Sequence, residues 1–269
     1  MTGCGQRSPQ AASPGAPVQA AAEPTPVVPA PAPAPASAPT AVAPLRDEIE
    51  HAPSYVIGIS YPHNVEPYPG LVALLHGYAQ AARAELMQAV AGLGNDRPTA
   101  PYELSLAFET VVQTPELIAV AADGSRYTGG AHGEPLVARF VWLVKSQQQL
   151  TAAALIPDPA GWQAIGQAAA AQLHAAAMQR AAADRLPAEE QAEQVASADR
   201  MIAEGTDAQA DNFSQFVPVL DPHGQIAALR FVFPPYQVGP YSDGTQMVEV
   251  SSKIMRPWIA AEYEHLFAR

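Results

Sequence analysis

The stretch FVFPPYQVGPYSDGTQMVEV, residues 231–250, begins and ends in strand-like runs and carries a loop of unusual composition between them. The loop, Pro234–Thr245, holds three prolines, two tyrosines, two glycines and one acid, with no regular hydrophobic period. Proline fixes its backbone angle, glycine permits angles closed to other residues, and tyrosine adds a rigid ring. The stretch therefore predicts a rigid loop that joins one buried strand to the next.

Further strand-like runs lie on both sides of this loop. They are rich in β-branched and aromatic residues and alternate in part between apolar and polar positions, which is typical of half-buried strands. The predicted strands are SYVIGISYP (54–62), YELSLAFETVVQ (102–113), ELIAVAAD (116–123), EPLVARFVWLV (134–144), FSQFVPVLD (213–221), QIAALRFVF (225–233) and QMVEVS (246–251). The second and third of these meet at TPE and predict an antiparallel pair.

Helical patterns occupy four other segments. Apolar residues recur every three or four positions over Pro69–Leu93, which predicts an amphipathic helix that the following GLGND ends. Asp158 can cap a second helix that starts at Pro159 and runs toward Asp184, and a third runs from Pro187 to Gly205. A terminal helix is expected over Lys253–Phe267.

Strands and helices are segregated along the chain rather than strictly alternating. This order favours an α+β fold, an antiparallel sheet with packed helices, in two closely associated parts. We expect a small α+β domain over residues 46–130 and a second α+β domain over residues 131–269. The alanine-rich pair of helices at about 159–205 is interpreted as an insertion in the second domain.

Residues 1–45 differ from the rest in composition. They are almost all Ala, Pro, Ser, Gln, Val, Thr and Gly, with the repeat PAPAPA at 31–36. Such a segment has too little apolar surface to bury for its ordering entropy to be offset. We expect a disordered, extended tether in front of the folded domains.

The single cysteine, Cys4, lies in MTGC at the head of this tether. Thr-Gly-Cys resembles the end of a bacterial lipoprotein signal, in which small residues precede a cysteine that becomes lipidated. The apolar stretch that precedes such a cysteine is missing, so we expect that the sequence starts just upstream of the processed end or was trimmed. No run of about 18 apolar residues occurs elsewhere. A lipid on Cys4 is therefore the expected membrane contact, and the non-acidic Gly5 favours the outer membrane of the bacterial periplasm.

The chain carries 26 acidic and 14 basic residues, which gives a net charge of −12 at pH 7. A charge of this sign repels nucleic acids and anionic membrane surfaces at long range. It favours encounter with a cationic partner.

Two motifs carry a resemblance to a known family. They are YTGGAHG, Tyr127–Gly133, and PYQVGPYSDG, Pro235–Gly244, in that order and flanked by the expected strands. They resemble the RsiV-like, PdaC-type extracytoplasmic domain family, whose members include a lysozyme-sensing anti-sigma factor and a peptidoglycan deacetylase. The resemblance covers residues 53–269. Neither a sigma-binding segment nor a deacetylase domain has a counterpart in these 269 residues.

The resemblance implies a non-catalytic cell-envelope lipoprotein that binds a lysozyme-like muramidase or a peptidoglycan fragment. Rigid proline and tyrosine side chains lose little freedom on binding, so the motif loops are preorganised for recognition. The candidate ligand-binding residues are Tyr127, Thr128, Gly129, Gly130, His132, Tyr236, Gly239, Pro240, Tyr241 and Asp243.

Two alternatives remain open at this point. One is a cell-wall-directed hydrolase in which His132 and Asp243 act as an acid and base, and the other is a structural envelope protein without a soluble ligand. The sequence lacks the His-Glu-x-x-His pattern, a Cys/His ligand spacing and the Gly-x-Ser-x-Gly elbow. We therefore expect no catalytic residues, no metal and no cofactor.

Overall fold

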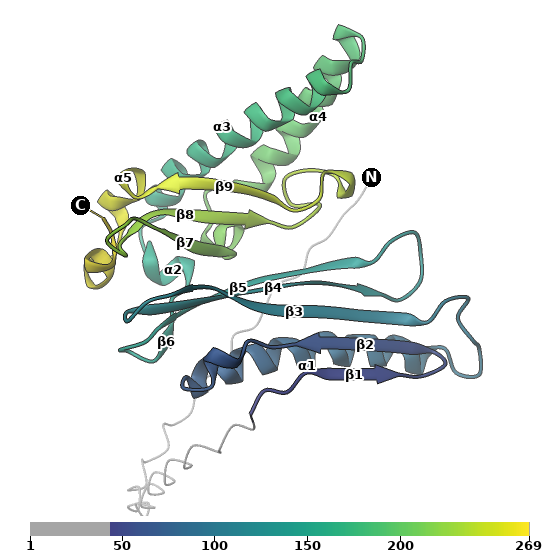
Figure 1. The fold of residues 1–269 in the computed structure, drawn as a ribbon. Coiled ribbons are helices and arrows are strands. Elements are labelled where there is room, and N and C mark those ends of the chain that lie inside the picture. The colour runs from purple at the N-terminus through teal and green to yellow at the C-terminus, as the bar shows by residue number, and fades with distance from the viewer. Residues whose placement is uncertain (1–43, 269) are drawn as a thin grey trace, which may run out of the picture. The chain divides into compact units, whose positions relative to one another are not determined.

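The computed structural model describes residues 44–268, which form two β-sheets and the helices that cover them (Figure 1). The lipidation predicted for Cys4 lies outside the described residues, and so do residues 1–43 of the tether predicted over residues 1–45. The predicted α+β class is confirmed.

The larger sheet has six strands in the order β1-β2-β3-β4-β5-β6. Its strands are β1 (Glu48–His51), β2 (Tyr55–Ser60), β3 (Tyr102–Gln113), β4 (Leu117–Tyr127), β5 (Glu134–Leu143) and β6 (Gln148–Gln149). Neighbouring strands are antiparallel except β2 and β3, which are parallel. The antiparallel sheet expected from the sequence therefore contains one parallel pair. The reason is α1 (Pro69–Gly92), which returns the chain to the starting end of β2 before β3 begins.

Helix α1 packs on one face of the six-stranded sheet, as its apolar periodicity predicts. The core between them is made of side chains from the helix and from alternate sheet positions: Leu71, Leu75, Leu86, Ile57, Leu104, Leu106, Ile118, Val120 and Phe140. Strand β4 is also apolar on its other face, where Leu117 and Ala119 join a second core. This explains why ELIAVAAD shows no alternation, since both faces of the strand are covered.

The smaller sheet covers the second face of β4 and β5. It consists of β7 (Phe216–Leu220), β8 (Ile226–Phe233) and β9 (Gln246–Ser251), all antiparallel. Phe213, Phe231 and Phe233 are fully buried in its core, and the ring of Trp162 stacks on that of Phe213. The strands predicted on each side of the 234–245 loop are confirmed.

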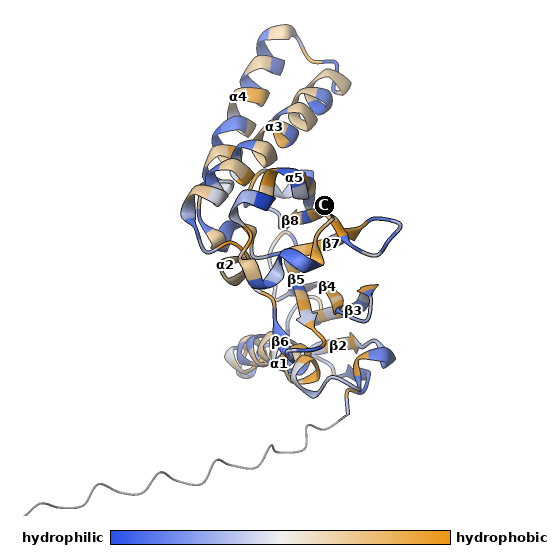
Figure 2. Ribbon diagram, turned by 90° about the vertical axis from the view of Figure 1, so that its left-hand side faces the viewer, coloured by the Kyte–Doolittle hydropathy of each residue, from blue (hydrophilic) through white to orange (hydrophobic). Residues whose placement is uncertain are grey.

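A helical hairpin, α3 (Pro159–Ala183) and α4 (Ala188–Gly205), follows the short helix α2 (Ala152–Leu155). The predicted limits are confirmed, and Asp158 Oδ1 accepts a hydrogen bond from the amide of Ala160 at 2.9 Å as the expected cap. The first half of α3 packs on the smaller sheet. Figures 1 and 2 both show the turn between the helices extending beyond that sheet.

The terminal helix expected over Lys253–Phe267 is wrong in extent. The segment forms three short pieces, α5 (Ser252–Met255), η4 (Arg256–Trp258) and η5 (Ala261–Leu266). Pro257 has no amide to donate within a helix, and Ile259 is extended, with φ −66° and ψ 131°. The amide of Ala260 donates instead to Leu155 O at 2.9 Å, which ties the chain end to α2.

The division expected between residues 130 and 131 falls in the loop that joins β4 to β5. These two strands pair from Leu117 with Leu143 to Arg126 with Glu134, so the six-stranded sheet runs across that position. The remaining helices and strands after residue 150 belong to the smaller sheet and its cover. None of the helices within residues 44–268 has both the length and the apolar character that a membrane span requires.

Candidate functional site

The two sequence motifs meet in the structure. The loop between β4 and β5 (residues 128–133, the β4–β5 loop) carries His132, and the loop between β8 and β9 (residues 234–245, the β8–β9 loop) carries Tyr236 and Tyr241. The imidazole of His132 stacks on the ring of Tyr241, with centroids 3.8 Å apart. His132 Nε2 and Tyr236 Oη are hydrogen-bonded at 3.0 Å. We call His132, Tyr236 and Tyr241 the aromatic cluster.

Two successive turns shape the β8–β9 loop. In the first, the amide of Gln237 donates to Pro234 O at 3.1 Å, and in the second the amide of Asp243 donates to Pro240 O at 3.1 Å. The amide of Tyr236 donates to Gly239 O at 2.9 Å between them. Gly239 leaves space for the side chain of Gln246, because a Cβ at Gly239 would lie 2.5 Å from Gln246 Nε2 and would force that side chain to move. Gly244, with φ +68°, turns the chain into β9. The Pro and Gly content of the motif thus follows from its backbone path.

Tyr236 has a backbone conformation that is rare for its residue type. Its φ is +75°, in the left-handed region that disfavours residues with a Cβ, and its side chain is 55% exposed. Strain of this kind persists only where the surrounding structure holds it, and it concentrates at functional sites. An exposed aromatic ring on a strained backbone therefore marks Tyr236 as a candidate for recognition.

The base of the β8–β9 loop is anchored in the fold. Val238 is 1% exposed and lies in the core of the smaller sheet. Gln237 Nε2 donates to Gly205 O at 3.0 Å and to Asn212 O at 2.8 Å, which joins the loop to the end of α4. Tyr236 directly precedes these anchors, and Tyr241 lies between them and β9.

The β4–β5 loop depends on two glycines. Gly129 and Gly130 have φ of +98° and +99°, a conformation that glycine adopts readily. Tyr127 Oη donates to Gly130 O at 3.3 Å across this turn, and His132 Nδ1 lies 3.3 Å from Gly133 O. The turn places His132 beside the other loop.

A pocket of about 430 Å³ lies beside the aromatic cluster. Thr128, Gly129, His132 and Tyr236 contribute to its lining, together with Arg126, Glu134, Pro135, Pro234 and Pro235. Arg126 forms ion pairs with Glu134, at 2.5 Å, and with Glu85 of α1. The positive charge of Arg126 is therefore neutralised by acidic partners.

Asp243 and Pro240 lie on the other side of the loop, facing the helical hairpin. Asp243 Oδ2 pairs with Arg180 Nη2 of α3 at 3.1 Å, and both loop residues line a cavity of about 570 Å³ against α3 and α4. Within residues 44–268, no hydrogen bond joins His132 to Asp243, and no group of three or more His, Cys, Asp or Glu is placed to hold a metal ion. The motif residues therefore divide between two faces of the loop.

Sequence reasoning missed three charged residues of this region, Arg126, Glu134 and Arg180. Arg126 and Glu134 stand opposite each other in the pairing of β4 with β5, so correct strand registration would have placed them together. Arg180 has a sequence signal too, since it is the one Lys, Arg, Asp or Glu in the 25 residues of α3.

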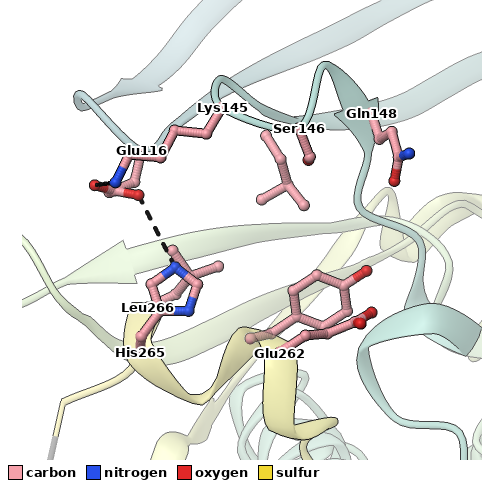
Figure 3. Close-up of a pocket in the computed structure, with 9 residues that line it drawn as sticks. Glu116, Lys145, Ser146, Gln148, Glu262, His265 and Leu266 are labelled. Carbon is pink, nitrogen blue, oxygen red and sulfur yellow. Dashed lines mark hydrogen bonds and ion pairs between the residues drawn. The ribbon is translucent and has the colours of Figure 1, made fainter.

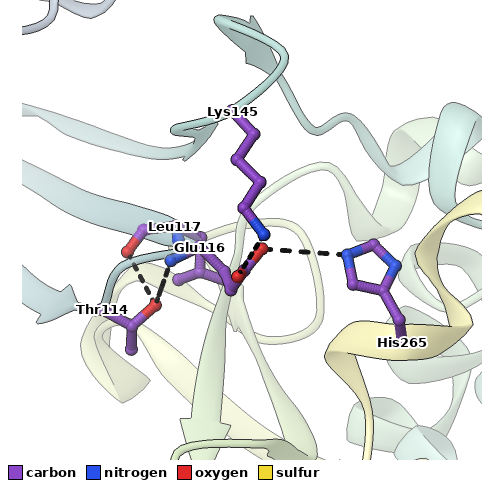
Figure 4. Close-up of polar contacts among 5 residues, drawn as sticks. All are labelled: Thr114, Glu116, Leu117, Lys145 and His265. Atoms are coloured by element: carbon purple, nitrogen blue, oxygen red, sulfur yellow. Dashed lines mark hydrogen bonds and ion pairs between the residues drawn. The ribbon is translucent and has the colours of Figure 1, made fainter.

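A second pocket, of about 280 Å³, lies at the opposite end of β4 (Figure 3). Lys145 Nζ donates to Glu116 Oε1 at 2.6 Å, and His265 Nε2 lies 3.9 Å from Glu116 Oε2 (Figure 4). Burial, and secondarily Glu262, raises the pKa of Tyr263 beside them. Three segments that are distant in sequence line this pocket, so no local sequence motif predicts it.

Comparison with known proteins yields no matching family model and no matching curated protein. Among solved structures, the chain is similar to a DUF3298 family protein from Pseudomonas aeruginosa PAO1, with a TM-score of 0.51 and 14% identity over 86% of this chain and 100% of that one. A DUF3298 family member from Bacteroides fragilis NCTC 9343 has a TM-score of 0.48 and 16% identity, over 81% and 92% of the respective chains. The fold of this chain is therefore similar to that of a DUF3298 protein, from a domain family of unknown function.

Proposed function

We propose that the chain is a non-catalytic, RsiV-like lipoprotein of the bacterial cell envelope that binds a cationic, lysozyme-like muramidase through the aromatic cluster. A peptidoglycan fragment is the other ligand that the resemblance implies. The observation that carries the proposal is the meeting of the two motif loops, in which His132 stacks on Tyr241 and hydrogen-bonds Tyr236.

The cluster has the properties of a protein recognition site. Tyrosine offers a large amphipathic surface with few rotatable bonds, so little conformational entropy is lost on binding. Contacts within the cluster restrict the rings of His132 and Tyr241 before any partner arrives, while Tyr236 is more than half exposed. A preorganised aromatic surface of this kind is a good centre for an interface.

Charge favours a cationic partner. The chain carries a net charge of −12, and Arg126, the basic residue of the pocket beside the cluster, is paired with Glu134 and with Glu85 of α1. Complementary charge speeds encounter and is screened by salt. We expect association with a cationic muramidase to be fast at low ionic strength.

The place of the protein in the cell follows from the same proposal. A lipid on Cys4 would hold the chain at the periplasmic side of the outer membrane, and the Pro- and Ala-rich segment would give the domain reach. Metabolic labelling with a radioactive fatty acid tests the anchor, because Cys4→Ala should abolish the label. Label retained in that variant would contradict it.

Calorimetric titration of the full chain tests the binding. Cationic lysozyme and soluble muropeptides are titrated separately, each at low and at high salt. The proposal predicts binding to lysozyme that weakens as salt rises. Binding to muropeptides alone would show that the ligand is a peptidoglycan fragment. No detectable binding to either ligand would contradict the proposed function.

A further inference from the structure

Arg180 of α3 connects the helical hairpin to residues 240–243 of the β8–β9 loop, which we call the tip of the loop. Its Nη2 lies 3.1 Å from Asp243 Oδ2 and donates to Gln246 Oε1 at 3.2 Å. Asp243 ends the short helix η3 (Tyr241–Asp243), and Gln246 is the first residue of β9. A single guanidinium therefore holds two residues of the segment that leads from the loop into β9.

The ion pair leads directly to the aromatic cluster. Tyr241 begins the same three-residue helix that Asp243 ends, so the two side chains are fixed by one turn of backbone. The ring of Tyr241 stacks on His132, with 14° between the ring planes. Movement of Asp243 away from Arg180 would consequently displace one face of the binding surface.

Packing alone does not fix the tip of the loop. A cavity of about 570 Å³ lies between the hairpin and the loop, lined on the loop side by Pro240, Ser242 and Asp243. By contrast, the base of the loop is held by the buried Val238 and by the two hydrogen bonds of Gln237. The polar contacts of Arg180 bridge the side of the loop that lies next to open space.

We propose that Arg180 is a positioning residue, through which the α3–α4 hairpin sets the conformation of the loop tip and so the affinity of the aromatic cluster for its partner. The affinity part rests on the proposed function, and the conformational part does not. The hairpin is then a support of the binding surface rather than an independent insertion.

Amide hydrogen exchange in Arg180→Met tests the conformational part, since methionine keeps the length of the side chain and removes its charge. The amides of Asp243 and Gly244 should exchange about two- to fivefold faster, the range for loss of a partly exposed ion pair. The amides of Tyr236 and Gln237 at the base should not change. Arg200→Met on the exposed face of α4 is the matched control, and Arg180→Lys should restore protection in part.

Titration with lysozyme tests the affinity part. Arg180→Met should weaken binding by about two- to fivefold, and Asp243→Asn, which keeps the size of the side chain, should do the same. The double variant should be no weaker than either single one. If Arg180→Met fails to fold, Asp243→Asn alone decides.

The outcomes separate the two proposals. Absence of lysozyme binding by the unaltered chain would remove the proposed function, while the exchange rates would still decide whether Arg180 holds the loop. Unchanged exchange at Asp243 and Gly244 would overturn the positioning role. Faster exchange with unchanged lysozyme affinity would overturn the link between the hairpin and the binding surface.

Discussion

The imidazole of His132 and the phenol ring of Tyr241 stack with their centroids 3.8 Å apart, although 108 residues separate them in the chain. The contact joins the β4–β5 loop of the larger sheet to the β8–β9 loop of the smaller one. Tyr236 completes the cluster through its hydrogen bond to His132. This arrangement gives the two sequence motifs a common location and underlies the predictions that follow.

The strained backbone at Tyr236 predicts an inverted order of stability between two substitutions. Tyr236→Gly and Tyr236→Ala both remove the ring, but only glycine accepts φ +75° without strain. Tyr236→Gly should therefore be more stable than Tyr236→Ala by about 1 kcal/mol. Chemical denaturation of the two variants measures the difference.

Tyr241 provides the matched control in the same loop. Its φ is not positive, so alanine suits its backbone and glycine adds only flexibility. Tyr241→Ala should be more stable than Tyr241→Gly, the opposite order. If the alanine variant is more stable than the glycine variant at both positions, the backbone at Tyr236 is not strained.

A side chain at Gly239 is expected to displace the side chain of Gln246. A Cβ there would lie 2.5 Å from Gln246 Nε2 and 3.2 Å from Asp243 Oδ2, within the contacts that hold the loop. Gly239→Ala should lower the free energy of unfolding by about 1–3 kcal/mol, the usual range for overpacking. Gly77→Ala, on the open surface of α1, should instead raise it by up to about 1 kcal/mol. A loss as large in Gly77→Ala would contradict the steric explanation.

Replacing Tyr61 by phenylalanine is expected to stabilise the folded protein. Its ring is 7% exposed and stacks on Phe108 at 5.0 Å, but its hydroxyl finds no hydrogen-bond partner among residues 44–268. Tyr61→Phe keeps the stack and removes the unpaired group, which costs about 1–3 kcal/mol when buried. The free energy of unfolding at neutral pH should rise by about 1 kcal/mol.

The same residue predicts a dependence on alkaline pH. Burial, with smaller contributions from Glu48 and Asp47, raises the pKa of Tyr61 to about 12. The unfolded chain loses this proton near the ordinary value of 10.0, so stability is complete below that pH and declines as pH rises toward 12. Tyr61→Phe should lose less stability over this window than the unaltered chain. Identical profiles would contradict the assignment.

Local signals in the sequence located most of the elements. The limits of α3 and α4 could be predicted because Asp158, Pro159 and Pro187 act within one turn of each helix. The end of the chain could not be read in this way, since its apolar residues suit a helix while Pro257 prevents one. Strand β1 was not predicted, because its sequence EIEH has a single apolar residue, the exposed Ile49, and no apolar alternation.

The sequence indicates which residues form the site, but it does not predict how their side chains are arranged. The motifs indicated His132, Tyr236 and Tyr241, but stacking across 108 residues depends on how the two sheets pack. The positive φ of Tyr236 likewise belongs to the turn that the hydrogen bond from the amide of Gln237 to Pro234 O closes, in which Tyr236 is the third residue. Arg180 lies outside both motifs, and its ion pair with Asp243 depends on how the hairpin packs beside the loop.

The most direct test is calorimetric titration of cationic lysozyme into the unaltered chain, Tyr236→Gly and Met247→Ala. Met247, on β9, is 59% exposed and serves as the matched exposed apolar residue outside the cluster. We predict that lysozyme binds the unaltered chain and Met247→Ala with similar affinity, and that Tyr236→Gly weakens binding by at least about tenfold, as for an interface hot spot. Equal affinity of all three proteins, or no binding by any, would contradict recognition through the aromatic cluster.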